Sequence, residues 1–553
     1  MTTELSRRNV LALGLAGITV GLLAGCTSTD STSSSGKDPF TGKTKGAMKS
    51  LGVNEQFKAT TPLTVSLLFQ DNPAYPEKSS WELWKDITEK TNVTFNPTIV
   101  PYADYNTKRS LLINSGNAPD VIAKTYPGSE TQFVGGGAII AASDYTQYMP
   151  NFTDKVKKWK LEPDLATIRQ ADGKYYVFPG LHQTLFVDYT IGARTDILEA
   201  DGIDTPTSWD ELHSALKKVK QKHPEIQYPF SDRWLGASTL NLAAATWGTM
   251  AGPNWGIGNG LLFDTKKQKF SFAPASDQFK DLLKYFASLV SEGLMDPESF
   301  TQSDDQALAK FNTGKSYFIN VNAQTLVLSR TAMEQNLGAG KFKIAKLPSP
   351  AGPLGKVITG SRLENGIMVS TDATKKSDFK ALLQFIDWLW YSDDAQVFLK
   401  WGIEGKTYEV KNGKYELLPG YKLSAYGFGD PNAKTDIRND MGFSCGNFMY
   451  GGTTKIVDST MPPEELAWQK VMSTYKQIPP SPGVPYTPTQ LQQATLQQTA
   501  LIDTANTATL NFILGKQGFD QWDSYVSSLK SKGMQTYVDN ANRYYAAVQK
   551  KIG

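Results

Sequence analysis

Short β-rich runs alternate with amphipathic helical segments in the first part of the folded chain. Trp81, Trp84 and Ile87 recur at i, i+3 and i+6, which is typical of one helix face. Apolar runs such as LTVSLLFQ (63–70), which is bounded by prolines, indicate buried strands. The predicted elements are strands at 63–70, 93–100 and 120–125 and helices at 79–92 and 102–116. This β-α-β-α-β order predicts an α/β fold in which a parallel or mixed sheet carries helices on both faces.

The same helical pattern returns later in the sequence. Helices are predicted at 207–220, at 276–297, at 377–402 with a break near Ser392–Asp393, and from about Leu491 to the C-terminus. Trp81, Trp84, Trp209 and Trp522 fall on apolar stripes and are predicted to lie in the core. Trp388 and Trp390 cannot both face one side of a helix, so we expect one of them to be exposed or at a contact. The Pro-rich stretch 478–490 predicts an extended crossing segment.

Length and composition narrow the class of protein. A chain of 553 residues is too long for one ordinary core and predicts at least two lobes. The net charge of +3 gives no reason to expect a nucleic-acid partner. Three histidines and two cysteines leave few ligands for a structural zinc, and few residues for a Cys/His nucleophile pair. We therefore expect no cofactor and no metal.

The N-terminus resembles a bacterial lipoprotein signal. Arg7 and Arg8 precede the uncharged run 10–25, which is short for a membrane span but fits a signal peptide. The sequence LAGC, ending at Cys26, resembles a lipobox, in which the thiol receives a lipid. Residues 1–25 are thus predicted to be a signal peptide, although a cysteine buried in an N-terminal helix is the alternative. SRRNVL also resembles a twin-arginine signal, which leaves Sec and Tat export both open.

The signal predicts the location of the mature protein. Residues 26–61 are rich in Ser, Thr, Gly and Lys and predict a flexible tether between Cys26 and the folded body. No other run approaches 18 apolar residues. We expect a protein that is lipid-anchored at the extracytoplasmic face of the cell membrane and does not span it.

Several stretches, in order, resemble the extracellular solute-binding proteins (family 1) of ABC importers. They are SGNAPDVI, ADGKYYVFPG (171–180), ARTDILEADGIDTPTSWDEL, FNTGKSYF, GIEGKTYEV (402–410) and FILGKQGFDQWDSYVSSLKSKG. The last two resemble the long, oligosaccharide-binding branch of that family. The resemblance extends from Pro62 to the C-terminus.

The resemblance implies a two-lobed periplasmic-binding-protein-like fold (type II) with two or three crossings and a hinge. On that pattern, lobe one comprises 62–187 plus 364–400, and lobe two comprises 188–363 plus 401–553. It also implies a monomer that closes on a carbohydrate, most simply an oligosaccharide, and delivers it to the permease subunits. Peptides stay open as an alternative ligand.

Candidate ligand-binding residues follow from the chemistry of sugars. Aromatic rings stack on the C–H faces of sugars, and carboxylates, amides and guanidinium groups reach the hydroxyls. In open α/β lobes ligands bind at the carboxyl ends of strands. The candidates are Asp71, Asn72, Tyr75, Tyr126, Trp234, Trp247, Trp255, Asn322, Arg362, Glu364, Glu404 and Tyr408. For the tryptophans the alternative is core packing, and for Glu404 and Tyr408 it is hinge or turn structure.

Two rival functions share these features. A glycan-degrading lipoprotein needs two carboxylates flanking one bond, but the sequence has no H-E-x-x-H or P-loop motif. A surface glycan-binding lipoprotein without a transport partner would also carry the anchor and the aromatics. A calcium loop is not expected at 264–272, because DTKKQKFSF has lysines where oxygen ligands are required.

Overall fold

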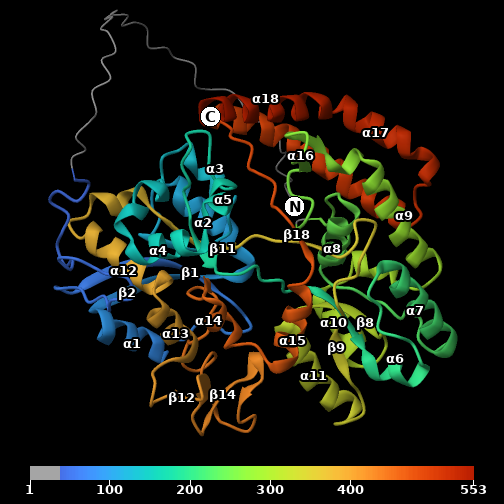
Figure 1. Ribbon diagram of the computed structural model, residues 1–553, viewed down its shortest axis with the longest axis horizontal. Helices are drawn as coiled ribbons and strands as arrows, with labels where there is room; N and C mark the ends of the chain where they lie inside the picture. The colour runs from blue at the N-terminus through green and yellow to red at the C-terminus, as the bar shows by residue number, and fades with distance from the viewer. Residues whose placement is uncertain (1–37, 254, 553) are drawn as a thin grey trace, which may run out of the picture. The chain divides into compact units, whose positions relative to one another are not determined.

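The structure is a computed structural model that describes residues 38–253 and 255–552. Of the N-terminal unit, residues 1–41, it describes residues 38–41, which lie in a turn. Residues 42–553 form a separate compact unit, to which the following refers. Within it, two mixed α/β lobes each carry a sheet of their own (Figure 1).

The sheet of lobe one has six strands in the order β17-β4-β11-β3-β1-β2. β1 pairs in parallel with both β2 and β3, while β11 runs antiparallel to β3 and β4. The mixed sheet predicted from the β-α-β-α-β pattern is therefore present. The strands are β1 (Leu63–Asp71), β2 (Val93–Pro101), β3 (Val121–Thr125), β4 (Phe178–His182), β11 (Leu363–Val369) and β17 (Gly451–Gly452).

Helices cover this sheet, among them α1 (Glu82–Thr91), α2 (Tyr105–Asn114), α4 (Pro150–Trp159), α12 (Phe379–Tyr391) and α13 (Asp393–Trp401). Ser392 ends α12 and caps α13, because its side chain accepts a hydrogen bond from the Ala395 N–H. The expected exposure of Trp388 or Trp390 is wrong, since both are 1% exposed. Almost every residue of α12 is buried, so the helix has no solvent face on which either ring could lie.

Residues 402–453 were expected in lobe two but pack on lobe one. The indole N–H of Trp81 donates to the Asn439 carbonyl, 3.1 Å away, and Phe448 packs on Phe69 with ring centroids 6.3 Å apart. β17 extends the lobe-one sheet beside β4. The segment carries the short strands β12 (Tyr408–Lys411), β13 (Lys414–Leu417), β14 (Tyr421–Leu423), β15 (Phe428–Gly429) and β16 (Thr435–Asp436).

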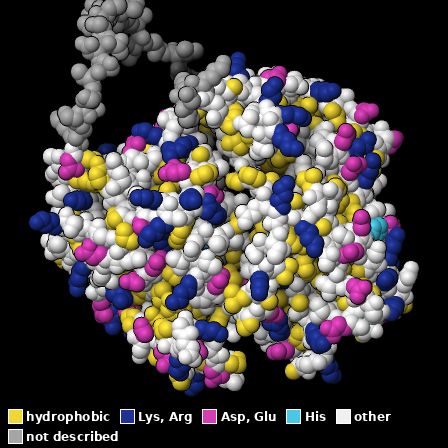
Figure 2. Space-filling model, in the orientation of Figure 1, with side chains coloured by type: hydrophobic (Ala, Val, Ile, Leu, Met, Phe, Trp, Pro, Cys, Tyr) yellow, Lys and Arg dark blue, Asp and Glu magenta, His cyan; other side chains and the backbone are white. Residues whose placement is uncertain are grey.

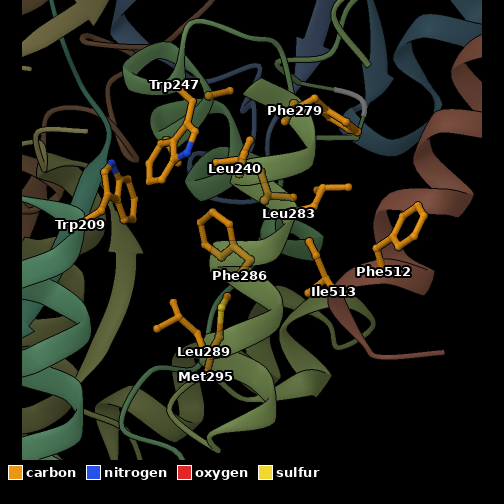
Figure 3. Packing of buried hydrophobic residues seen from close by; sticks show 14 of the residues in the cluster. Trp209, Leu240, Trp247, Phe279, Leu283, Phe286, Leu289, Met295, Phe512 and Ile513 are labelled. Carbon is orange, nitrogen blue, oxygen red and sulfur yellow. The ribbon is translucent and has the colours of Figure 1, made fainter. Parts of the chain in front are cut away.

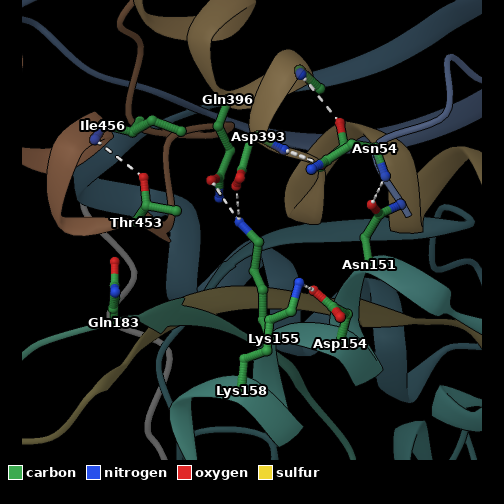
Figure 4. A network of polar contacts seen from close by, with 12 residues as sticks. Asn54, Asn151, Asp154, Lys155, Lys158, Gln183, Asp393, Gln396, Thr453 and Ile456 are labelled. Atoms are coloured by element: carbon green, nitrogen blue, oxygen red, sulfur yellow. Dashed lines mark hydrogen bonds and ion pairs between the residues drawn. The ribbon is translucent and has the colours of Figure 1, made fainter.

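The expected flexible tether is wrong for residues 42–61, which pack against lobe one. Phe57 is fully buried, and Met48 exchanges two backbone hydrogen bonds with the Gln384 amide of α12. Asn54 donates its N–H to Asn151 and accepts the Asp393 N–H (Figure 4). Buried polar partners compensate for the missing apolar periodicity of this stretch. Residues 26–37 lie outside the described part.

Lobe two is built on β5 (Thr190–Arg194), which pairs antiparallel with β8 (Phe318–Val321) and β9 (Ile344–Lys346). Its main core joins α9 (Asp277–Ser291) to the C-terminal helix α16 (Pro488–Ile513); Trp209, Trp247, Phe286 and Phe512 belong to this cluster (Figure 3). In Figure 1 the C-terminal helices, red, run beside α9. Other helices of this lobe are α7 (Trp209–Lys222), α8 (Ala237–Trp247), α10 (Asp304–Asn312), α11 (Ala323–Leu337), α17 (Trp522–Ser531) and α18 (Met534–Ile552).

Three segments cross between the lobes. The first, 183–189, joins β4 to β5, and the second, 347–362, joins β9 to β11 and contains β10 (Val357–Thr359). The third leaves β17 through α14 (Thr454–Asp458) and α15 (Pro463–Met472) to β18 (Lys476–Ile478), which pairs with β10. The Pro-rich stretch then touches both lobes, since Gly483 N–H donates to Thr167 O while Val484 packs on the lobe-two core.

Candidate functional site: a cavity between the lobes

A cavity of about 410 Å³ lies between the two lobes. Its size falls within the range of small-molecule binding sites. Strand ends of lobe one, the first crossing and the N-terminus of α11 contribute to its wall. Five of the predicted ligand-binding residues line it: Asn72, Tyr75, Tyr126, Asn322 and Glu364.

The lobe-one wall forms where neighbouring strands end. Asn72 and Tyr75 follow β1 in a tight turn, in which the Tyr75 N–H donates to the Asn72 carbonyl. Tyr126 follows β3, and His182 is the last residue of β4. Because these strand ends meet at one edge of the sheet, their side chains reach the same cavity.

Glu364 of β11 is the most extensively bonded carboxylate on this wall. Its Oε2 lies 2.9 Å from His182 Nε2 and accepts the Gly451 N–H at 2.8 Å. Burial acts to raise the pKa of Glu364, but the bond to His182, the charge of Lys124 and the Gly451 N–H outweigh it and lower that pKa. Glu364 is therefore held ionised in the cavity.

Three cations line the same wall, and none forms an ion pair with a described residue: Lys124, Lys400 and Arg438. Lys400, in the last turn of α13, is 7% exposed, and burial lowers its pKa to about 8 against the pull of Glu364. Burial also lowers the pKa of Lys124. The Arg438 guanidinium lies over the Tyr75 ring, 4.0 Å from its centroid.

The opposite wall has a charge pair of its own. Lys346 of β9 donates to both carboxylate oxygens of Glu465, at 2.9 and 3.0 Å, and to the Asp188 carbonyl. Burial raises the pKa of the Asp188 side chain to about 6 although Lys346 is near. Asn322 caps α11 by accepting the Thr325 N–H, and its amide faces the Asp188 carboxylate at 3.4 Å.

Aromatic rings border the cavity on both sides. Tyr102 and Tyr126 line it and are 59% and 58% exposed. On the lobe-two side the lining residue Tyr189 packs edge-on against Trp234 and Trp255, with centroids 5.4 and 4.8 Å away. Trp234 and Trp255 are thus one ring removed from the cavity wall. Such rings offer faces on which sugar C–H groups can stack.

Besides Trp234 and Trp255, five further predicted site residues do not line the cavity. Trp247 packs against Trp209 in the lobe-two core, because α8 turns that face inward. The Nη2 atom of Arg362 forms an ion pair with Oδ2 of Asp164, 2.5 Å away, and this pair fastens the second crossing segment to lobe one. The other three residues serve local structure. The Asp71 carboxylate accepts a hydrogen bond from the Glu77 N–H. Glu404 forms a backbone β-bridge with Tyr408, and the Tyr408 ring packs on Trp401.

Sequence reasoning missed the charged part of the wall, namely His182, Asp188, Lys400, Arg438 and Lys124. Lys124 carried a usable signal, because a lysine interrupts the otherwise apolar run that precedes Thr125. Arg438 carried none, since its cavity position depends on how 402–453 folds back onto lobe one. Lys400 carried none either, since a lysine in the last turn of a helix is common in sequences. Gly446, also missed, allows close approach: a Cβ there would lie 2.5 Å from Tyr75 Oη and 3.1 Å from Lys124 Nζ.

Two further observations bear on ligands and membranes. Within residues 38–253 and 255–552, no three His, Cys, Asp or Glu side chains gather closely enough to hold a metal ion. In the same part of the chain, no helix combines the length and apolarity needed to cross a bilayer. Charged side chains of both signs are interspersed on the face seen in Figure 2.

Comparison with known proteins agrees with this architecture. The chain is 25% identical over 435 residues to Lipoprotein LipO of Bacillus subtilis (strain 168), covering 74% of this chain and 76% of LipO. It is 25% identical over 415 residues to the polygalacturonan/rhamnogalacturonan-binding protein YtcQ of the same strain, covering 73% and 74%. The crystal structure of the alginate-binding protein AlgQ2 without calcium ion superimposes with a TM-score of 0.67 at 20% identity, covering 89% of this chain and 99% of AlgQ2. This likeness shows the two-lobed fold. The model of the bacterial extracellular solute-binding protein family matches residues 73–397, more than half of the chain, so the protein belongs to that family.

Proposed function

We propose that this protein is the membrane-anchored solute-binding component of an ABC importer, which captures an oligosaccharide in the inter-lobe cavity and delivers it to the permease. Family membership supports the transport role, and the names of YtcQ and AlgQ2 refer to carbohydrates. Cys26, outside the described residues, is the proposed lipid attachment point, with residues 1–25 removed as the signal peptide.

The observation that carries the proposal is the composition of the cavity wall. Exposed rings of Tyr102 and Tyr126 lie beside hydrogen-bonding groups such as Asn72 and Glu364, in a space of about 410 Å³. Stacking faces next to paired donors and acceptors suit a sugar better than an apolar ligand or a peptide side chain. Because both lobes supply wall residues, binding would favour the closed arrangement of the lobes.

A glycan-binding or glycan-degrading lipoprotein that is not coupled to transport is the alternative. The cavity holds the carboxylates Glu364, Asp188 and Glu465, so a hydrolytic pair is the specific point to test. Glu465 is bound on both oxygens by Lys346, and Glu364 is ionised, which leaves Asp188 as the carboxyl with a raised pKa. A carboxyl with a raised pKa and an ionised carboxylate are the two partners that hydrolysis uses, so the recovery of intact or shortened sugars decides between the two functions.

The function is tested by calorimetric titration of the purified chain with a panel of neutral and acidic oligosaccharides, followed by analysis of the recovered sugars. We expect micromolar or tighter binding of at least one sugar, which is recovered intact. Shortened products would support the degrading alternative, and an absence of binding across the panel would contradict the proposal.

The anchor is tested separately. Cells that express the chain with and without Cys26→Ser are labelled with radioactive palmitate and fractionated. We expect label and membrane retention in the unsubstituted chain and the loss of both in the variant. Equal retention would contradict lipid attachment at Cys26.

A further inference from the structure

The lobe-one wall of the cavity carries more positive charge than the carboxylates on that wall can neutralise. Lys124, Lys400 and Arg438 face the cavity with Glu364 as the carboxylate among them. That carboxylate is already bonded to His182 and to the Gly451 N–H. Among the described residues, the three cations are left without a carboxylate in direct contact.

Two of these cations are buried, so their positive charge without a partner is energetically costly. Lys400 is 7% exposed and Arg438 is 5% exposed, and the Nε and Nη1 atoms of Arg438 are buried with no partner among the described residues. A buried cation that lacks a partner is unfavourable, so proteins retain such groups where a ligand supplies the opposite charge. The rings of Tyr75 and Tyr426 lie 4.0 and 5.5 Å from the Arg438 guanidinium but bring no negative charge.

The backbone at Lys124 is also unusual for a lysine. Its φ is 51°, in the left-handed region, although it lies within β3. The pairing of β11 with β3 shifts register opposite this point, between Gly366 and Met368. Strain of this kind persists where the surroundings impose it, and here it turns the Lys124 side chain into the cavity beside Gly446.

The opposite wall does not cancel this charge. Glu465 is paired with Lys346 on both oxygens, and Asp188 faces Asn322 and Lys346 across lobe two. On the lobe-two side, the carboxylate of Glu465 is neutralised by Lys346. On the lobe-one side, the positive charge exceeds the negative charge. A bound molecule would meet cations on one wall and hydrogen-bond acceptors on the other.

We infer that the ligand is an acidic oligosaccharide, whose anionic group binds between Lys124, Lys400 and Arg438 while its hydroxyls face Asp188 and Glu465. This deepens the proposed function and rests on it. A guanidinium and two ammonium groups match the oxygens of a carboxylate or a sulfate ester equally well. The shared chemistry is an anionic substituent on a sugar ring, and the experiment separates the two sources.

The test uses ligand pairs that share the sugar backbone and differ in whether they carry the negative charge. The purified chain is titrated with uronate oligosaccharides such as trigalacturonate and mannuronate trimers, with their methyl esters, and with sulfated and unsulfated neutral trisaccharides. We expect one acidic member to bind at least about tenfold more tightly than its uncharged counterpart, which corresponds to about 1.4 kcal/mol. The uronate and sulfate arms identify the anionic group.

Variants locate the effect. Lys400→Met is expected to remove most of the preference for the acidic member, Lys400→Arg to retain part of it, and Lys218→Met, on the exposed face of α7, to leave it unchanged. Lys124→Met is the second variant should Lys400→Met not fold, as judged by its thermal melt. A preference that persists in both Met variants would overturn the assignment.

Failure of the inference is distinguishable from failure of the proposed function. If uncharged sugars bind as tightly as their acidic counterparts, the acidic specificity is wrong and oligosaccharide capture stands. If no member of either series binds, both are wrong.

Discussion

The Nε2 atom of His182 lies 2.9 Å from Oε2 of Glu364, which joins the end of β4 to β11 at the wall of the inter-lobe cavity. The same carboxylate oxygen accepts the Gly451 N–H and so ties in the first residue of β17. One carboxylate thus connects three neighbouring strands at the point where two crossings begin. The ligand site and the base of the hinge share this group.

Glu364→Gln is expected to lower the free energy of unfolding at pH 7 by about 1–2 kcal/mol, because it removes charge-assisted hydrogen bonds beside buried cations. The folded-state pKa of Glu364 lies below its ordinary value of 4.5, so its stabilisation is present above that pH and is lost as the pH falls through the folded pKa. Thermal melts between pH 3 and 7 measure this. A stability gap between wild type and variant that stays constant across the range would contradict the assigned ionisation.

Tyr126→Ala and Trp247→Ala are expected to have opposite effects. Tyr126 is exposed in the cavity, so its loss should weaken oligosaccharide binding about 3- to 10-fold with little change in melting temperature. Trp247 is 9% exposed in the lobe-two core, so its loss should destabilise by about 3–5 kcal/mol. Calorimetry measures ligand affinity and denaturant melts measure stability for both variants. A destabilised Tyr126→Ala would contradict the placement of that ring in the cavity.

Gly446→Ala is expected to weaken ligand binding. The added Cβ would come 2.5 Å from Tyr75 Oη and 3.1 Å from Lys124 Nζ, and would displace both groups in the cavity. Gly136→Ala is the matched control, because the nearest atom to its Cβ would be the Phe133 carbonyl oxygen at 3.9 Å. Unchanged affinity in Gly446→Ala would show that Tyr75 and Lys124 do not contact the ligand.

Lys346→Met is expected to destabilise the protein by about 3–5 kcal/mol, because it leaves Glu465 buried without its cation. The double variant Lys346→Met/Glu465→Met should recover most of that loss, since no charge stays buried. A double-mutant cycle from urea melts measures the coupling. Additive losses would contradict a direct pair between β9 and α15.

Affinity for an acidic oligosaccharide is expected to fall as the pH rises above about 8. Burial lowers the pKa of Lys400 to about 8, so in the free protein its ammonium loses its proton as the pH rises through that value. Lys400→Arg, which stays charged, should bind with an affinity that is flat from pH 7 to 9. Titrations at several pH values compare the two, and identical pH profiles would exclude Lys400 as the titrating group.

Local sequence patterns predicted much of the fold. The helix break at Ser392 and the strands β1, β2 and β3 were predictable because apolar periodicity and capping act over a few residues. Cys445, which lies in the segment 402–453, is 1% exposed, and burial raises its pKa to about 11.

The parts that sequence did not predict depend on long-range packing. Residues 402–453 return to lobe one through contacts such as Phe448 with Phe69, more than 370 positions apart. Arg438 reaches the cavity as a result of that return. In contrast, Asn72, Tyr75 and Tyr126 were predictable because they follow strands whose carboxyl ends share one edge of a sheet.

The most direct test of the central claim is a distance measured between the lobes with and without ligand. Spin labels at Leu111→Cys in α2 and Leu328→Cys in α11, both exposed, are introduced in the Cys26→Ser chain, where the buried Cys445 is protected from labelling. We predict that the oligosaccharide found by calorimetry shortens the pulsed-EPR distance, and that Tyr126→Ala requires more ligand for the same change. Saturating ligand that leaves the distance unchanged would contradict capture between the lobes.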